Sequence, residues 1–233
     1  MACLAQLSAL AMGMTLVNAE TTVIGTEAPF PPYTFIAEDG QITGFDRAVG
    51  DEACLRAGLV CTWVNMRFDR LMPGVMSGDI DIAMGGIAKT AERMALVDFT
   101  MDYSFSDGLD NFVGRSGAPE PDQALIGVQA GTIQEQHLRK TGRNFISYGT
   151  EGDLLEALIA QKVDLAFGAF YAGTVSDLFA ENGIEWLYEE DAGENGIGMA
   201  VCKENKALLA QLNKALKSMQ DDGTIDALSD EWF

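Results

Sequence analysis

The chain has 233 residues, 48% of them hydrophobic, which is enough to bury the core of one large domain or two small ones. Its 35 acidic and 15 basic residues give a formal net charge of −20, which repels nucleic acid and anionic lipid and excludes both as partners. The cysteines and the single histidine, His137 on an expected exposed helix face, lack the spacing of metal ligands or a catalytic triad, so no metal and no cofactor are expected.

Residues 1–19 form an uncharged segment rich in Leu, Ala and Met that ends in Val17-Asn18-Ala19. Small residues at this point are typical of signal-peptidase cleavage, so we predict a secretory signal peptide at 1–19 and a periplasmic protein that starts at Glu20. The segment lacks a basic n-region. A start further upstream therefore stays open, as does an N-terminal membrane anchor, although the apolar run is short for a span.

Apolar and amphipathic segments alternate after residue 20 and predict a strand-helix-strand-helix-strand order at residues 21–28, 45–58, 60–66, 68–78 and 79–84. This order is typical of a doubly wound α/β unit. Asp46 is expected to cap the first helix and Gly58 to end it. Cys54 and Cys61 lie at the end of this helix and on the next strand, where a small-loop disulfide would form in an oxidising compartment. Cys202 is then unpaired and expected to be buried as a small hydrophobe.

The third strand runs into the sequence "MGGIAKTAER". Gly85-Gly86 lacks Cβ atoms and lets the backbone approach a ligand closely. Thr90 is a good N-cap, and Arg93 then puts a cation in the first helical turn, where the helix dipole disfavours it. A residue that breaks a local rule is a candidate for function, and a guanidinium can bind a carboxylate through two parallel hydrogen bonds. A surface salt bridge with Glu92 or Asp98 is the alternative.

The same order recurs after a segment rich in Gly and Pro, residues 104–123, which we predict to be a linker. Strands are expected at 124–129, 145–149 and 163–170, with helices within 130–142 and 150–162. A last strand within 193–201 precedes an amphipathic helical tail. The repeated order predicts two lobes that the chain connects twice, and a cleft between lobes is where small ligands bind.

Side chains from three further loops are candidates for this cleft. Thr132 and Glu135 form a capping box that leaves free amides at a helix start, although a well-capped helix alone would explain the pattern. Phe30 and Phe68 could clamp the apolar part of a ligand, with Glu27 meeting a positive group. Isolated phenylalanines are more often core residues, so that alternative stays open.

Several stretches together resemble the periplasmic solute-binding proteins for polar amino acids, family 3, which are the binding components of ABC importers. They are "VIGTEAPFPPYTFIAEDGQITGFDRAVGDEACLRAG", "FDRLMPGVMSGDIDIAMGGIAKTAERMALVDFT", "GVQAGTIQE" and "MQDDGTIDALSDEWF". The resemblance implies a periplasmic-binding-protein type II fold, with two doubly wound α/β lobes joined by two hinge strands. Lobe one would comprise residues 20–111 and 197–233, and lobe two residues 112–196. The spacing of Cys54 and Cys61 also matches a disulfide of the histidine and lysine/arginine/ornithine binders.

The resemblance assigns roles to individual residues. Arg93 is expected to bind the α-carboxylate of the ligand, helped by the Ala88 amide, and the Gly86 carbonyl to bind the α-ammonium. The full set of expected ligand-binding residues is Glu27, Phe30, Phe68, Gly86, Ala88, Arg93, Thr132, Ile133 and Gln134. Catalytic residues are not expected.

Three positions depart from the family pattern. Ala88 and Ile133 stand where a hydroxyl side chain is common. Ala169 replaces the lobe-two acid that pairs with the ligand ammonium, and a buried ammonium without a charged partner is costly. The ligand therefore either lacks an ordinary α-ammonium, or Glu27 or another acid supplies the partner.

The resulting hypothesis is a monomeric periplasmic protein that closes its hinge over a small carboxylate-bearing solute, an amino acid or a derivative, and delivers it to a membrane-embedded ABC permease. Two alternatives stay open. One is an enzyme similar to cyclohexadienyl dehydratase on the same fold, for which "AFGAFYAG" offers only Tyr171 as a general acid. The other is a ligand-sensing domain.

Overall fold

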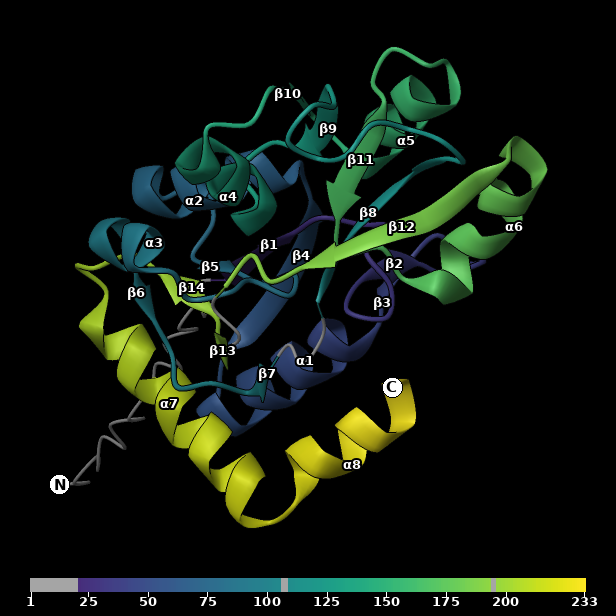
Figure 1. The fold of residues 1–233 in the computed structure, drawn as a ribbon. Helices are drawn as coiled ribbons and strands as arrows, with labels where there is room; N and C mark the ends of the chain where they lie inside the picture. The colour runs from purple at the N-terminus through teal and green to yellow at the C-terminus, as the bar shows by residue number, and fades with distance from the viewer. Residues whose placement is uncertain (1–20, 106–108, 194–195) are drawn as a thin grey trace, which may run out of the picture.

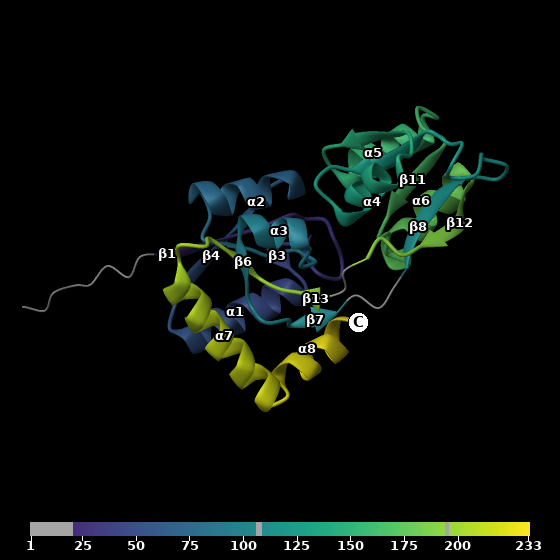
Figure 2. The same ribbon diagram turned by 60° about the vertical axis from the view of Figure 1, so that its left-hand side comes forward.

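The computed structural model describes residues 21–105, 109–193 and 196–233. The expected signal peptide, residues 1–19, lies outside these ranges. Two five-stranded sheets form two α/β lobes, which Figure 1 and Figure 2 show as separate groups of strands and helices. This arrangement confirms the expected fold class. Within the described ranges no helix has both the length and the apolar character needed to span a membrane.

Lobe one is built on a mixed sheet with the strand order β4-β1-β5-β14-β6. β1 is parallel to β4 and β5, whereas β14 runs antiparallel to β5 and β6. Its strands are β1 (Thr21–Thr26), β4 (Val60–Asn65), β5 (Ile82–Ala83), β6 (Asp98–Phe99) and β14 (Ala200–Val201). Its helices are α1 (Phe45–Ala57), α2 (Phe68–Ser77), α3 (Ala91–Leu96), α7 (Lys206–Asp221) and α8 (Thr224–Trp232). A short hairpin of β2 (Phe35–Ile36) and β3 (Ile42–Thr43) precedes α1.

The sheet of lobe one is buried on both faces because successive side chains of a strand point to opposite sides. Ile24 and Ile82 pack with α1, α7 and α8 in one apolar cluster. Ala83 and Ala200 pack with Leu71 of α2 in a second cluster. The loops that follow β1 and β5 are therefore held by a core on each side of the sheet.

Lobe two is built on a second mixed sheet, with the strand order β10-β9-β11-β8-β12. Its strands are β8 (Asp110–Arg115), β9 (Ile126–Gln129), β10 (Phe145–Tyr148), β11 (Leu165–Gly168) and β12 (Ile184–Glu190), and its helices are α4 (Ile133–Thr141), α5 (Glu151–Ile159) and α6 (Ala172–Asn182). Helices α5 and α6 cover one face and α4 covers the other.

The chain connects the lobes twice, beside a short antiparallel pair of β7 (Ser104–Phe105) and β13 (Gly196–Ile197). It passes from β7 to β8 and returns from β12 to β13. The prediction that residues 104–123 form a linker is wrong, because this segment contains β7 and the inner strand β8. β8 pairs antiparallel with β11 and β12, which come later in the chain, so no local repeat indicated it.

Local predictions had mixed outcomes. Gly58 ends α1 in the left-handed conformation, as expected. Asp46 does not cap α1, since the N-cap position is Gly44 and the fully buried Asp46 side chain accepts a hydrogen bond from the Gly86 amide instead. The Cys54–Cys61 disulfide is confirmed. Cys202 is only half-buried, and its thiol donates a hydrogen bond to Glu204.

Candidate functional site

A cavity of about 120 Å³ lies between the two lobes. All nine residues in the expected ligand-binding set line it: Glu27, Phe30, Phe68, Gly86, Ala88, Arg93, Thr132, Ile133 and Gln134. The structure thus brings together residues that are far apart in the sequence and belong to both lobes. Their contact with a ligand stays a prediction.

The structure adds further residues to the lining of this interlobe cavity. They are Tyr33, Gly85, Asp110, Gln129, Glu151, Leu154, Phe167, Gly168, Ala169, Phe170 and Ile197. Two of them are acids that the expected set lacks, and their environments are described below. Among the described residues, no group of His, Cys, Asp or Glu side chains is arranged to hold a metal ion.

Arg93 is the buried cation of the cavity. Thr90 caps α3 and accepts a hydrogen bond from the Arg93 amide at 3.1 Å, which fixes the start of the helix. The side chain is only 5% exposed. Its Nη1 donates to the Ala88 carbonyl at 2.8 Å, and its Nη2 crosses the cleft to the Gly131 carbonyl at 2.9 Å. Burial lowers the pKa of Arg93 to about 10, although nearby Glu92 partly offsets the effect.

The guanidinium of Arg93 has no carboxylate partner in the described part of the chain. The alternative of a surface salt bridge is therefore wrong. Asp98 pairs with Lys206 instead, and Glu92 forms no ion pair among the described residues. A buried charge whose side-chain hydrogen bonds go only to neutral carbonyls is incompletely compensated, so the site favours an anion next to Arg93.

Gly86 and Asp46 shape the loop after β5. Gly86 has a φ of 60°, and a Cβ at this position would lie 2.7 Å from the ring of Phe30. Only glycine allows this close approach. The Asp46 carboxylate accepts the Gly86 amide at 2.7 Å from α1, which anchors the loop to lobe one. Complete burial raises the pKa of Asp46 to about 6, although the hydrogen bond from Gly86 opposes the rise.

Two aromatic side chains border the cavity. Phe30 stacks on Tyr33, with ring centroids 5.3 Å apart and planes 9° from parallel. The Phe68 ring lies under the Arg93 guanidinium, with Cζ 5.3 Å from the ring centroid. Both phenylalanines are half-buried. Their rings line the cavity, and Phe68 also packs against the apolar cluster under α2.

Lobe two contributes the start of α4. Thr132 caps this helix by accepting the Glu135 amide at 3.2 Å, and its own hydroxyl donates to the Gln129 carbonyl at 2.7 Å. The capping prediction is therefore confirmed. Gln134 is buried, and its Nε2 donates to the Asp110 carboxylate at 2.5 Å. The helix start and the acid of β8 are held together by this contact.

Three carboxylates line the cavity. Glu27 accepts a hydrogen bond across the cleft from Gln129 Nε2 at 2.6 Å. Burial raises the pKa values of Glu27 and Asp110, and the hydrogen bonds from Gln129 and Gln134 oppose these shifts. Burial, reinforced by the negative charge of Glu27, raises the pKa of Glu151 to about 7. Facing one arginine, these three acids make the cavity a site for positive groups as well as for one anion.

Asp110 lies beside the position where Ala169 breaks the family pattern. β8 and β11 are antiparallel, with Gly168 opposite Asn111. Extending this register by one residue on each strand brings Ala169 opposite Asp110. Opposite residues of an antiparallel pair point to the same face of the sheet. The carboxylate that is missing from the loop after β11 is thus present on the neighbouring strand.

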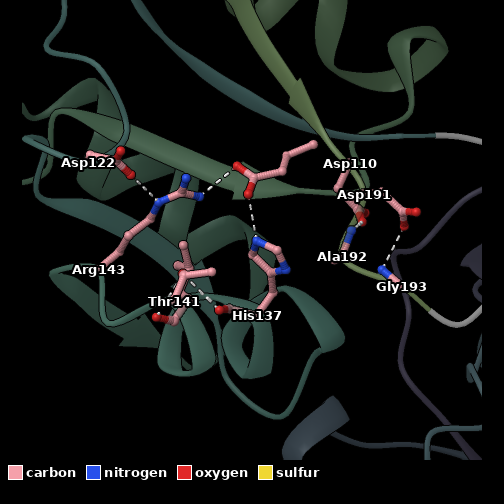
Figure 3. A network of polar contacts seen from close by, with 10 residues as sticks. Asp110, Asp122, His137, Thr141, Arg143, Asp191, Ala192 and Gly193 are labelled. Atoms are coloured by element: carbon pink, nitrogen blue, oxygen red, sulfur yellow. Dashed lines mark hydrogen bonds and ion pairs between the residues drawn. The ribbon is translucent and has the colours of Figure 1, made fainter.

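A polar network fixes the end of β12 beside Asp110 (Figure 3). The Glu190 carboxylate binds His137 Nε2 at 2.7 Å and Arg143 Nη1 at 2.6 Å. Arg143 also binds Asp122, while the Ala192 amide donates to Asp110 at 3.3 Å. The expected exposed position of His137 is wrong, since its side chain is 17% exposed and contacts the segment that returns to lobe one.

The sequence signals of the missed acids were weak. Glu151 follows the cap residue Thr150, where an acid normally serves the helix dipole. Asp110 lies in the segment predicted to be a linker. Gln129 is the last residue of β9, and a strand end alone does not indicate which groups face a cavity.

Known proteins resemble this chain over nearly its whole length. A family model described as bacterial extracellular solute-binding proteins, family 3, matches residues 22–233. The L-arginine-binding protein of Pseudomonas aeruginosa is 29% identical over 252 aligned positions, which cover 99% of this chain and 96% of that protein. The putative ABC transporter arginine-binding protein 2 of Escherichia coli is 30% identical, covering 97% of each.

A solved structure shows the same fold. It is a periplasmic His/Glu/Gln/Arg/opine family-binding protein from Silicibacter pomeroyi in complex with lysine. It is 29% identical, with a TM-score of 0.80, and the match covers 91% of this chain and 96% of that chain.

Proposed function

The chain belongs to family 3 of the bacterial extracellular solute-binding proteins, and from that premise we propose that it binds an amino acid between its lobes and delivers it to an ABC importer. The names of the relatives support this ligand class, since they bind arginine or occur with lysine. The observation that carries the proposal is the buried guanidinium of Arg93. It faces a cavity formed by both lobes and lacks a carboxylate partner in the described part of the chain.

The α-carboxylate of the ligand completes the environment of Arg93. Charge-assisted hydrogen bonds of an arginine to a carboxylate are short and strong, and they gain further strength where water is excluded. The start of α4 also lines the cavity, and the amides of a helix start favour an anion there. Ala88 would use its backbone amide, since its side chain has no hydroxyl.

The ligand ammonium binds Asp110 in this proposal. The carboxylate of Asp110 is 8% exposed, lines the cavity and has no cation bound to it among the described residues. It comes from lobe two, whereas Arg93 comes from lobe one. An amino acid held at both ends would therefore join the lobes, and such a ligand favours the closed state over the open one.

The division into lobes is part of the proposal. Because β8 belongs to the sheet of lobe two from Asp110 onward, the expected boundary after residue 111 moves forward. Residues 20–109 and 197–233 would move as one body and residues 110–196 as the other, with the two crossing segments as the hinge. The hydrogen bonds from Arg93 to Gly131 and from Gln129 to Glu27 cross the cleft and would form on closure. The protein would act as a periplasmic monomer.

We propose that the protein is not an enzyme, in line with relatives that are named as binding proteins. One observation favours the dehydratase alternative, because a carboxyl group whose pKa is about 7 is suited to general acid catalysis. An assay of prephenate and arogenate decides this point. Turnover that Glu151→Gln abolishes would establish the enzyme, and no turnover at high protein concentration would exclude it.

Calorimetry with the ligand-free protein tests the proposed function. We expect L-arginine or another polar amino acid to bind with a Kd of about 1 µM or lower, which needs about 8 kcal/mol of net binding free energy. Agmatine, which is arginine without its carboxylate, should bind at least about 100-fold more weakly because it leaves Arg93 uncompensated. Arg93→Met should cause a loss of similar size, whereas the neighbouring exposed Glu92→Gln should not. Equal binding of agmatine and arginine would contradict the proposal.

A further inference from the structure

We propose that Glu151 makes the cavity selective for a ligand with a positively charged side chain. With Glu27 it forms a pair of carboxylates, one from each lobe, that closes around a cation. This inference rests on the proposed function above and narrows its ligand class from amino acids to cationic amino acids, with Glu151 as the residue that sets the preference.

Glu27 provides the lobe-one half of the pair. It follows β1 directly and lines the cavity, and its carboxylate accepts Gln129 Nε2 at 2.6 Å from the other lobe. This neutral hydrogen bond fixes the carboxylate at the interface, where burial raises its pKa and the nearby charges of Asp69 and Arg67 shift it in opposite directions. Glu27 is therefore held at the interface once the lobes are closed.

Glu151 provides the lobe-two half. It is the first residue of α5, is half-buried and lines the same cavity. In the described ranges its carboxylate has no hydrogen bond and no ion pair. Burial raises the pKa of this group, and the like charge of Glu27 acts on it in the same direction.

Among the described residues no cation forms an ion pair with Glu27 or Glu151, although the charge of Arg67 acts on Glu27 and opposes the rise in its pKa that burial causes. On its own helix, the Asp153 carboxylate binds the Thr150 hydroxyl at 2.9 Å. On the facing lobe, Arg67 and Asp69 at the start of α2 bind each other at 2.8 Å. The Arg93 guanidinium is held by backbone carbonyls on the other side of the cavity. A positive ligand group is thus the missing partner.

The two carboxylates make the closed cavity selective for a positively charged side chain over a neutral one. Two like charges that share a poorly hydrated site cannot both stay ionised without a counter-charge. The pKa of Glu151, raised by burial and by Glu27 to about 7, agrees with this conclusion. If the lobes closed over a neutral side chain, one of the two carboxylates would therefore have to be protonated. An ammonium or guanidinium group supplies the counter-charge, so both carboxylates can stay ionised. A guanidinium has donors on several edges and can bind both carboxylates at once.

Paired calorimetric titrations with L-arginine and L-citrulline test the inference. Citrulline replaces the guanidinium by a neutral urea group of similar shape. At about pH 8 we expect the wild-type protein to bind arginine at least about 100-fold more tightly than citrulline. When the lobes close over citrulline, the carboxylate of Glu151 takes up a proton if the pH lies between the usual pKa of a glutamate and the raised pKa of Glu151. Citrulline binding should therefore strengthen as the pH falls from about 8 to about 5.5, while arginine binding should not.

Glu151→Gln provides the decisive variant, and Glu156→Gln on the exposed side of the same helix is the matched control. Glu151→Gln should weaken arginine binding at least about tenfold, strengthen citrulline binding and remove the pH dependence for citrulline. Glu156→Gln should behave as the wild type. Thermal unfolding without ligand shows whether each variant is folded.

The outcomes separate this inference from the proposed function. An unchanged arginine-to-citrulline ratio in Glu151→Gln, or a wild-type protein that prefers glutamine or citrulline to arginine, overturns the inference while amino acid binding stands. Absence of binding for all of these amino acids overturns both. A preference for arginine that falls only in the Glu151 variant supports the assigned role.

Discussion

Asp110 is the proposed partner of the ligand ammonium. It is buried on β8, it receives hydrogen bonds from Gln134 and from the Ala192 amide, and burial raises the pKa of its carboxyl group. Both donors are neutral, so they orient the carboxylate without balancing its charge. An ammonium group is the partner that would balance it.

Asp110→Asn tests this role at a single atom. The amide keeps an oxygen that can accept the Gln134 hydrogen bond but loses the charge that attracts the ammonium. We expect the affinity for L-arginine to fall at least about tenfold. The deamino analogue of arginine lacks the ammonium group, so it should bind the variant no more weakly than it binds the wild-type protein. Equal losses for both ligands, measured by calorimetry, would show that Asp110 serves the fold and not the ammonium.

Arg93, which breaks a local rule, could be predicted from the sequence, whereas Glu151, which obeys one, could not. Arg93 stands out as a cation in the first turn of a helix, and the structure places it in the cavity. Glu151 also lines the cavity but looks like an ordinary acid at a helix start. Its significance arises from Glu27 in the other lobe, and no pattern within one segment contains that information.

Among the elements, helix α1 and the loop after β5 are linked by a hydrogen bond and act as one structural unit. Asp46 lies in the first turn of α1, yet its carboxylate accepts the Gly86 amide and so couples the helix to the wall of the cavity. The group is fully buried, and its pKa is about 6 rather than 3.8. Burial of the Asp46 charge therefore lowers the stability of the fold, while its hydrogen bond with Gly86 holds the loop after β5 in place.

Asp46→Asn should reveal that cost as a pH dependence. Because the folded-state pKa lies above the unfolded value, the folded state prefers the protonated acid, and stability is lost as the pH rises from about 4 to about 6. The span corresponds to about 3 kcal/mol for a fully buried group. Relative to the variant, the wild type should lose this amount between about pH 4 and pH 7 in urea unfolding. A difference between the two proteins that is constant with pH would contradict the assignment.

The elements themselves were predicted with uneven success for a physical reason. Helices α4 and α5 carry their start signals locally, in Thr132 and Thr150, and both caps are present. Strand β8 carries no such signal, since it lies between glycines and prolines and gains its partners β11 and β12 only after the chain has turned back. Antiparallel pairing of this kind depends on the whole lobe.

At the scale of the whole molecule, charge and closure are linked. Arg93 from lobe one faces the Gly131 carbonyl of lobe two, whereas Glu27 and Glu151 oppose each other with like charge. The first contact favours closure, and the second opposes it until a cation arrives. A ligand that carries both a carboxylate and a positive side chain satisfies both conditions, which couples its chemistry to the hinge.

Small-angle scattering measures this coupling. We expect L-arginine to lower the radius of gyration of the ligand-free protein by on the order of 1 Å, as lobe closure does in two-lobed binding proteins. Agmatine lacks the carboxylate for Arg93, and citrulline lacks the cation for Glu27 and Glu151, so neither should cause this change at about pH 8 when supplied at the arginine concentration. In Glu151→Gln, citrulline should become able to close the lobes.

The forward scattering of the same samples also gives the mass, which should be that of a monomer. A radius that arginine leaves unchanged while calorimetry reports tight binding would mean that the lobes do not move, and the charge of the ligand would then act on affinity alone.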